Sequence, residues 1–174
     1  AGSSLMEMFP VEELAKEAKL NAIIYNRGVG GFVTDELLEN IDTCILDLKP
    51  SKLFINIGTN DLSNPDIPIA EKIICQVKDS LPDVSIYFMA YYPINYDAAT
   101  DEMKPCLLVR TNKKIDEANA AVRALAQKHN EMYIDITAPL KDENGNLKAE
   151  YTIEGMHINE DGYRSIFPEF MKYV

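Results

Sequence analysis

Residues 53–61 read Leu-Phe-Ile-Asn-Ile-Gly-Thr-Asn-Asp, a short apolar run that stops at a glycine and three polar residues. The run is apolar without clear alternation, which is typical of a strand buried on both faces of a parallel sheet. Polar residues that follow such a strand directly lie at its carboxyl end, where α/β sheets bind their ligands. The stretch therefore predicts both the class of fold and the edge of the sheet at which a site would lie.

Segments typical of strands and of helices alternate on both sides of this stretch. Further strands are predicted at residues 22–25, 84–89 and 132–136, and helices at residues 9–19, 35–48, 68–80, 109–129 and 161–173. This alternation favours a parallel sheet with helices on both faces. The sequence therefore predicts a single domain over residues 1–174, a three-layer α/β/α, flavodoxin-like fold with a parallel sheet of about five strands.

The first residues of the chain leave a gap in this sheet. Gly2-Ser3-Ser4 stands before the first helix, where a turn from a strand into a helix is expected, but almost no residues precede it. A doubly wound sheet normally has a strand at that place. We therefore expect the N-terminal strand to lie upstream of Ala1, or another segment to take its place.

The composition narrows the classes of function. The formal net charge of −11 disfavours binding to nucleic acid or to anionic membranes, because the field repels phosphates. No apolar run approaches the roughly 20 residues that a membrane span needs. The chain shows no signal peptide, which favours the cytoplasm, although a chain that opens at Ala1 could have lost a leader.

Cysteine and histidine are few. Cys44, Cys75 and Cys106 are widely spaced and form no Cys-x-x-Cys pair, which argues against a disulfide scaffold or a zinc site. His129 and His157 are the two histidines of the sequence, too few for a histidine-rich metal centre. We expect no metal and no cofactor, and we expect His129, near a helix end, to be structural.

Four short segments are unusual together: residues 2–5 (GSSL), 26–31 (NRGVGG), 58–61 (GTND) and 154–157 (EGMH). In this order, from residue 2 to about residue 163, the chain resembles the SGNH hydrolases, also called GDSL-type esterases and lipases. Within them it is most similar to the branch of the platelet-activating-factor acetylhydrolase catalytic subunits. The resemblance implies a serine esterase that cleaves a small-molecule ester through an acyl-enzyme. The expected acyl group is short, such as acetyl on a carbohydrate or a lipid.

The resemblance also implies a role for individual residues. Ser4 corresponds to the nucleophile and His157 to its general base, and Ser4, Gly31 and Asn60 correspond to the donors of the oxyanion hole. The chemistry agrees, because a serine hydroxyl is a poor nucleophile until a base takes its proton. Glycine brings a backbone N–H close to substrate, and Asn60 can donate a side-chain N–H to the charge that develops in the transition state.

Two positions depart from the family pattern. Ser3 stands where the family usually has aspartate, next to a nucleophile that is retained. Glu154 stands three residues before His157, where the family usually has aspartate. Its side chain is one methylene longer, so two arrangements are open: Glu154 orients His157, or a backbone carbonyl does so and leaves a Ser–His dyad. We favour Glu154, because in a catalytic triad of serine, histidine and a carboxylate the carboxylate orients the histidine.

The sequence leaves other interpretations open. The change to Glu154 and the missing first strand are compatible with a binding module for carbohydrate that keeps the fold and has lost efficient catalysis. Residues 28–31 are a weak match to a phosphate-binding loop, and Asp61 is expected to be only a turn former. Residues 93–108 are expected to form a loop that shapes the acyl pocket. Association into a homo-oligomer is left open.

Overall fold

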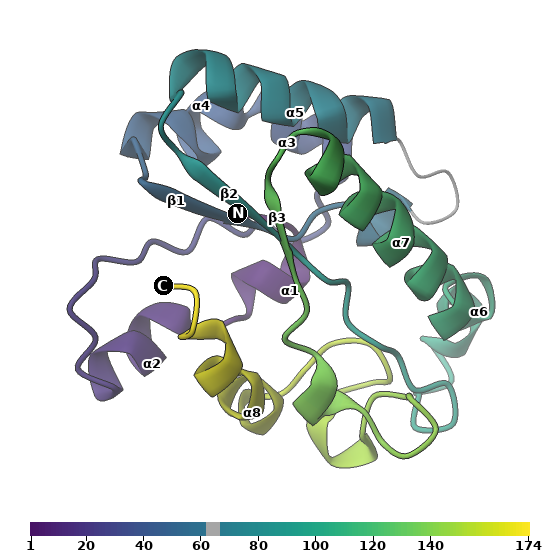
Figure 1. The fold of residues 1–174 in the computed structure, drawn as a ribbon. Coiled ribbons are helices and arrows are strands. Elements are labelled where there is room, and N and C mark those ends of the chain that lie inside the picture. The colour runs from purple at the N-terminus through teal and green to yellow at the C-terminus, as the bar shows by residue number, and fades with distance from the viewer. Residues whose placement is uncertain (62–66) are drawn as a thin grey trace.

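Residues 53–61 form most of the first strand and the 3-10 turn that follows it. In the computed structural model, which describes residues 1–61 and 67–174, β1 (Lys52–Ile55) pairs in parallel with β2 (Ser85–Met89). β2 in turn pairs in parallel with β3 (Met132–Ile134), so that the strand order is β1-β2-β3 (Figure 1). Leu53 and Ile55 are buried, as the apolar run predicts.

The helices follow the alternation that the sequence predicts. They are α1 (Ser4–Glu7), α2 (Val11–Glu17), α3 (Thr34–Glu39), α4 (Ile41–Cys44), α5 (Ile67–Ser80), α6 (Lys104–Val109), α7 (Asn112–Lys128) and α8 (Glu160–Phe170). Short 3-10 helices lie at Leu46–Leu48, Thr59–Asp61, Ala138–Leu140 and Ala149–Tyr151. No helix in the described part of the chain is long and apolar enough to cross a membrane.

These helices cover both faces of the sheet. α3, α4, α5 and α7 pack on one face, in a core that contains Leu37 and Ile115, and they lie above and to the right of the strands in Figure 1. α1, α2 and α8 pack on the other face, in a second core that contains Leu14 and Ile166 (Figure 1). This arrangement confirms the predicted three-layer α/β/α fold.

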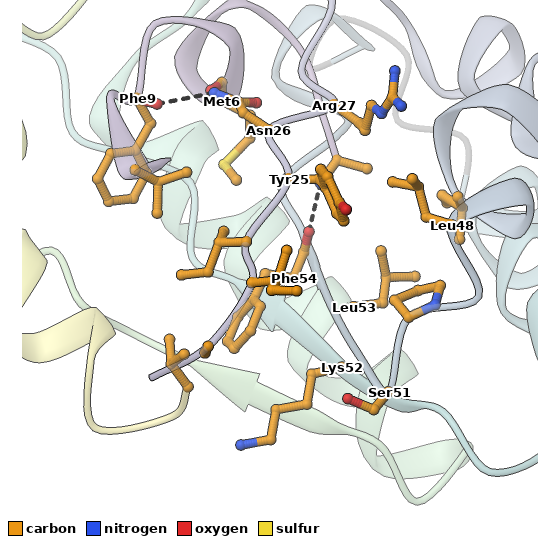
Figure 2. Close-up of a pocket in the computed structure, with 18 of the residues that line it drawn as sticks. Met6, Phe9, Tyr25, Asn26, Arg27, Leu48, Ser51, Lys52, Leu53 and Phe54 are labelled. Carbon is orange, nitrogen blue, oxygen red and sulfur yellow. Dashed lines mark hydrogen bonds between the residues drawn. The ribbon is translucent and has the colours of Figure 1, made fainter. Parts of the chain in front are cut away.

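The prediction of a strand at residues 22–25 is wrong. Ile23 and Tyr25 are exposed, and the nearest pairing is an isolated bridge from Gly28 to Gly2. A groove of about 380 Å³ lies between this segment and β1 (Figure 2), so the segment lies beside no described strand with which it could form a ladder. The described sheet therefore has three strands, where the sequence predicts about five.

Residues 1–3 extend along the end of β1. The Ala1 amino group donates to Phe54 O at 2.7 Å, and the backbone N–H of Asn56 donates to Ala1 O at 3.1 Å. The N–H of Ser3 then donates to Asn56 O at 3.3 Å. These bonds bring Ser4 to the carboxyl end of β1, the edge at which the sequence predicts a site.

The predicted helix at residues 35–48 is broken into shorter pieces. Asn40 ends α3, and its side-chain Nδ2 donates to Glu36 O at 2.9 Å. An asparagine side chain that bonds the preceding turn competes with the backbone for the same carbonyl and favours a break. The chain then continues as α4 and a 3-10 turn that ends at Lys49, in the left-handed conformation.

The predicted helix at residues 109–129 begins later than expected. Thr111 is the N-cap of α7, and its hydroxyl oxygen accepts from the N–H of Lys114 at 3.3 Å. A capping threonine favours a helix start at the next residue. The preceding residues form α6 instead, so the expected loop at residues 93–108 contains a short helix.

Candidate active site

Ser4 lies at the first position of α1, directly after residues 1–3, which pair with the end of β1. Ser3 is buried, and its carbonyl accepts from the N–H groups of Met6 and Glu7 at 3.0 and 2.9 Å. This turn holds the Ser4 side chain so that its Oγ lies 3.0 Å from Nε2 of His157. A hydroxyl and an imidazole nitrogen at this separation form a hydrogen bond, the arrangement that a nucleophile and its base require.

Glu154 lies on the other side of the imidazole. Its Oε1 is 2.6 Å from His157 Nδ1 and accepts the backbone N–H of His157 at 3.1 Å. Because an ionised carboxylate only accepts hydrogen bonds, this contact places the imidazole proton on Nδ1 and leaves Nε2 free to accept from Ser4. The longer glutamate side chain therefore reaches the imidazole, and no backbone carbonyl is needed to hold the ring.

A tight turn between Glu154 and His157 makes this contact possible. Gly155 has φ +102°, and a Cβ there would lie 2.6 Å from the side chain of Ala99. The Gly155 N–H donates to Thr152 Oγ1 at 2.7 Å, and that hydroxyl donates to His157 O at 3.0 Å. Glycine is required here by conformation and by space together.

The three N–H donors that the sequence assigns to an oxyanion hole belong to Ser4, Gly31 and Asn60. The backbone N–H groups of Ser4 and Gly31 have no acceptor among the described residues. Asn60 Nδ2 donates to Phe32 O at 2.9 Å, which leaves its second hydrogen for another acceptor. Gly31 has φ +81° and open space where a Cβ would be, so its backbone conformation requires the glycine.

Hydrogen bonds at two places connect the segments that carry Ser4, Gly31 and Asn60. Val29 N–H donates to Gly2 O at 2.9 Å, so the glycine segment lies against the residues that precede Ser4. Asp61 Oδ2 accepts from the N–H of Thr34 at 2.9 Å and from the Thr34 hydroxyl. The expectation that Asp61 is only a turn former is therefore wrong, because its carboxylate joins the Asn60 turn to the start of α3.

The line of Ser4, His157 and Glu154, together with the backbone and amide donors, is the geometry of a serine hydrolase. Residues 9–165 match the model of the GDSL-like Lipase/Acylhydrolase family. The chain belongs to this family. It is therefore a carboxylic ester hydrolase, and the resemblance that the four sequence segments indicated is confirmed.

Solved structures similar to this hydrolase have the same fold. A candidate platelet activating factor from Streptococcus pneumonia superposes with a TM-score of 0.85 and 31% identity, over 99% of this chain and 80% of that one. A GDSL-like lipase from Bacteroides thetaiotaomicron VPI-5482 gives 0.74 and 18%, over 98% and 83% of the two chains. A catalytic mutant of an acetylxylan esterase from Geobacillus stearothermophilus gives 0.72 and 17%, over 98% and 90%.

One curated relative is larger than this hydrolase. The N-acylneuraminate cytidylyltransferase of Escherichia coli O18:K1:H7 (strain RS218 / NMEC) is 27% identical over 181 residues, which cover 99% of this chain and 39% of that protein. The chain thus spans about two fifths of the length of the curated relative it matches.

Two asparagines of α7, Asn112 and Asn119, bond the backbone of the chain that follows β2. Asn119 Oδ1 accepts from Tyr91 N–H at 2.7 Å, and Asn112 Oδ1 accepts from Ile94 N–H at 2.8 Å. Each also donates back to the carbonyl of the same residue, at 3.3 and 3.0 Å. These paired bonds hold the chain that leaves β2.

His129 lies away from this constellation. Its Nε2 is 2.7 Å from Glu71 Oε1, and the Lys128 ammonium bonds the same oxygen at 2.6 Å. Hydrogen bonds from Lys128 and His129 lower the pKa of the Glu71 carboxyl below its usual value. The contact joins the end of α7 to α5 and supports the structural role that the sequence predicts. Within residues 1–61 and 67–174, no group of His, Cys, Asp and Glu side chains is arranged to hold a metal ion.

Proposed function

We propose that the protein hydrolyses a short-chain carboxylic ester through an acyl-enzyme on Ser4, with His157 as general base and Glu154 as its orienting partner. The observation that carries the proposal is the unbroken line from Ser4 Oγ to His157 Nε2, at 3.0 Å, and from His157 Nδ1 to Glu154 Oε1, at 2.6 Å. Nucleophile, base and orienting group within hydrogen-bond reach of one another are the requirement for covalent acyl transfer.

In the first half of the reaction, Ser4 Oγ attacks the ester carbonyl carbon while His157 Nε2 takes the hydroxyl proton. Glu154 stabilises the imidazolium that forms and keeps the ring in place. The tetrahedral intermediate then breaks the bond to the alcohol oxygen, and His157 returns the proton to that oxygen. The alcohol leaves, and the acyl group stays on Ser4.

The negative charge of the intermediate falls on the former carbonyl oxygen. The N–H groups of Ser4 and Gly31 and the second hydrogen of Asn60 Nδ2 are the donors proposed for this oxyanion. Their lack of other acceptors among the described residues supports this assignment. In the second half of the reaction, water attacks the acyl group with His157 again as base, and the acid is released.

We propose acetyl as the acyl group and a carbohydrate as the alcohol. Among the structural neighbours is an acetylxylan esterase, and the curated relative is named for an acylated sugar acid. The apolar groove of Figure 2 is not lined by Ser4 or His157, so it does not serve as a channel for a long acyl chain from the serine. A panel of acetylated sugars identifies the alcohol.

Turnover of 4-nitrophenyl acetate by the Ser4→Ala variant tests the proposal. We expect its rate to fall to the background of the buffer, while Ser3→Ala, a matched change at the neighbouring serine, keeps most of the activity. Normal turnover by Ser4→Ala would refute the nucleophile. The acyl group is tested by comparing the rates on acetate, butyrate and octanoate esters. Rates on butyrate and octanoate that equal the rate on acetate would contradict a preference for acetyl.

A further inference from the structure

Arg110 lies between the two loops that carry Asn60 and His157. Its Nη2 donates to Asn60 Oδ1 at 3.1 Å, and its Nη1 contacts the sulfur of Met156, the residue directly before His157. The guanidinium is therefore one side chain away from a proposed oxyanion donor and one residue away from the proposed base.

The charge of this guanidinium has no close partner in the described part of the chain. Both groups that it contacts are neutral, and no described carboxylate lies within ion-pair distance of it. Arg164 differs, because it forms ion pairs with Glu17 and Glu160. A partly buried, uncompensated cation costs stability, and in a chain with a net charge of −11 its lack of a carboxylate partner is unexpected.

Arg110 stays charged in spite of its burial, and part of its donor set is free. Burial lowers the pKa of Arg110, and the electrostatic effects of Cys106 and of the Asp61 carboxylate raise it by less. A guanidinium stays protonated in proteins even so, and it carries five N–H donors in a planar fork. The contacts with Met156 and Asn60 use one donor each on Nη1 and Nη2, so three donors have no acceptor among the described residues. Such a fork fits a carboxylate in two parallel hydrogen bonds.

We infer that Arg110 is a specificity-determining residue that binds a carboxylate on the alcohol part of the ester, so that the enzyme prefers esters of acidic alcohols. The inference rests on the proposed esterase function of Ser4 and His157. The anion is placed on the alcohol because an acetyl group carries no charge of its own. An acidic sugar that bears an acetyl ester has the chemistry that this site requires.

Arg110 has a second effect that the test must separate from the first. By donating to Asn60 Oδ1, it fixes which way the Asn60 amide faces and so directs Nδ2 toward Phe32 O and the site. Loss of Arg110 therefore slows every ester, through the oxyanion donor. The binding of a carboxylate is therefore measured by the loss of kcat/KM on an anionic ester beyond the loss on a neutral ester.

The test compares kcat/KM for two probes, 4-acetoxybenzoate and its neutral methyl ester, in the wild-type enzyme and in Arg110→Gln. Glutamine can still donate to Asn60 but carries no charge. We expect the ratio of anionic to neutral kcat/KM to fall roughly 10- to 100-fold in Arg110→Gln, the worth of a charge-assisted hydrogen bond. Arg123→Gln is the matched control. Arg123 lies on α7, where its guanidinium stacks over the ring of Tyr133 of β3, and its replacement should leave the ratio unchanged.

Each outcome decides one question. An unchanged ratio in Arg110→Gln, whether both rates fall or neither does, overturns the inference and leaves the esterase intact. A wild-type enzyme that hydrolyses neither probe counts against the proposed function instead. If Arg110→Gln does not fold, a second measurement shows whether the site prefers a carboxylate. It compares the inhibition of the wild-type enzyme by 4-hydroxybenzoate and by its neutral methyl ester. We expect the acid to bind roughly tenfold tighter or better, and equal inhibition overturns the inference.

Discussion

Replacement of Glu154 by glutamine removes one negative charge from the site and keeps the shape of the side chain. The carboxylate oxygen lies 2.6 Å from His157 Nδ1, and the two side chains are 15% and 23% exposed. Opposite unit charges about 4 Å apart attract by about 4 kcal/mol at an effective dielectric constant of 20, which is about a thousandfold in rate. Partial exposure weakens the attraction, so we expect kcat to fall about 10²- to 10³-fold.

The assay is the initial rate of 4-nitrophenyl acetate hydrolysis as a function of substrate concentration. KM should change little, because the carboxylate lies behind His157, on the side away from Ser4. Glu150→Gln is the matched control, since Glu150 is exposed on the nearby 3-10 helix, and it should keep full activity. Thermal unfolding of both variants checks that the fold is retained.

Glu154→Asp sharpens the same test. Aspartate is the usual residue of the family, but on this backbone its carboxylate would end roughly 1.5 Å short of the present position, the length of one carbon–carbon bond. We expect a rate between those of the wild-type enzyme and Glu154→Gln. Retention of kcat within about threefold by Glu154→Gln would refute the electrostatic argument.

Three further changes test the loops around the site. Asn60→Ala removes one proposed oxyanion donor, and kcat should fall about 10²- to 10³-fold at unchanged thermal stability; a loss in KM alone would contradict the assignment. Asp61→Asn weakens the tie to Thr34, so kcat should fall roughly tenfold, and a crystal structure should show the Asn60 turn displaced. Gly155→Ala forces an alanine to φ +102° and into Ala99, so it should destabilise the fold by about 1–3 kcal/mol in urea unfolding and lower kcat as well. Unchanged unfolding of that variant would show that the turn is not strained.

The layers of the fold could be predicted from local patterns. Short apolar runs identify β1, β2 and β3, because strands buried on both faces have that composition. Residues 22–25 have the same composition but form no strand. A strand needs a neighbouring backbone to pair with, and whether one is present is not encoded in the segment itself.

The site also has a part that the sequence predicts and a part that only the folded chain shows. The order of the four segments brings Ser4, Glu154 and His157 together, and the 2.6 Å contact between His157 Nδ1 and Glu154 Oε1 supports the proposal that Glu154 orients the imidazole. The tie from Asp61 to Thr34 and the contact of Arg110 with Asn60 join residues 27 and 50 positions apart. No local pattern marks such pairs, so they could be found only from the folded chain.

If Ser4 is a nucleophile activated by His157, a fluorophosphonate probe will label it. The probe forms a covalent bond with an activated serine, and peptide mass mapping locates the adduct. We expect one adduct, on Ser4, in the wild-type protein and in Ser3→Ala, and none in Ser4→Ala. An adduct of equal yield in Ser4→Ala, or none in wild-type protein that hydrolyses the acetate ester, would contradict this expectation.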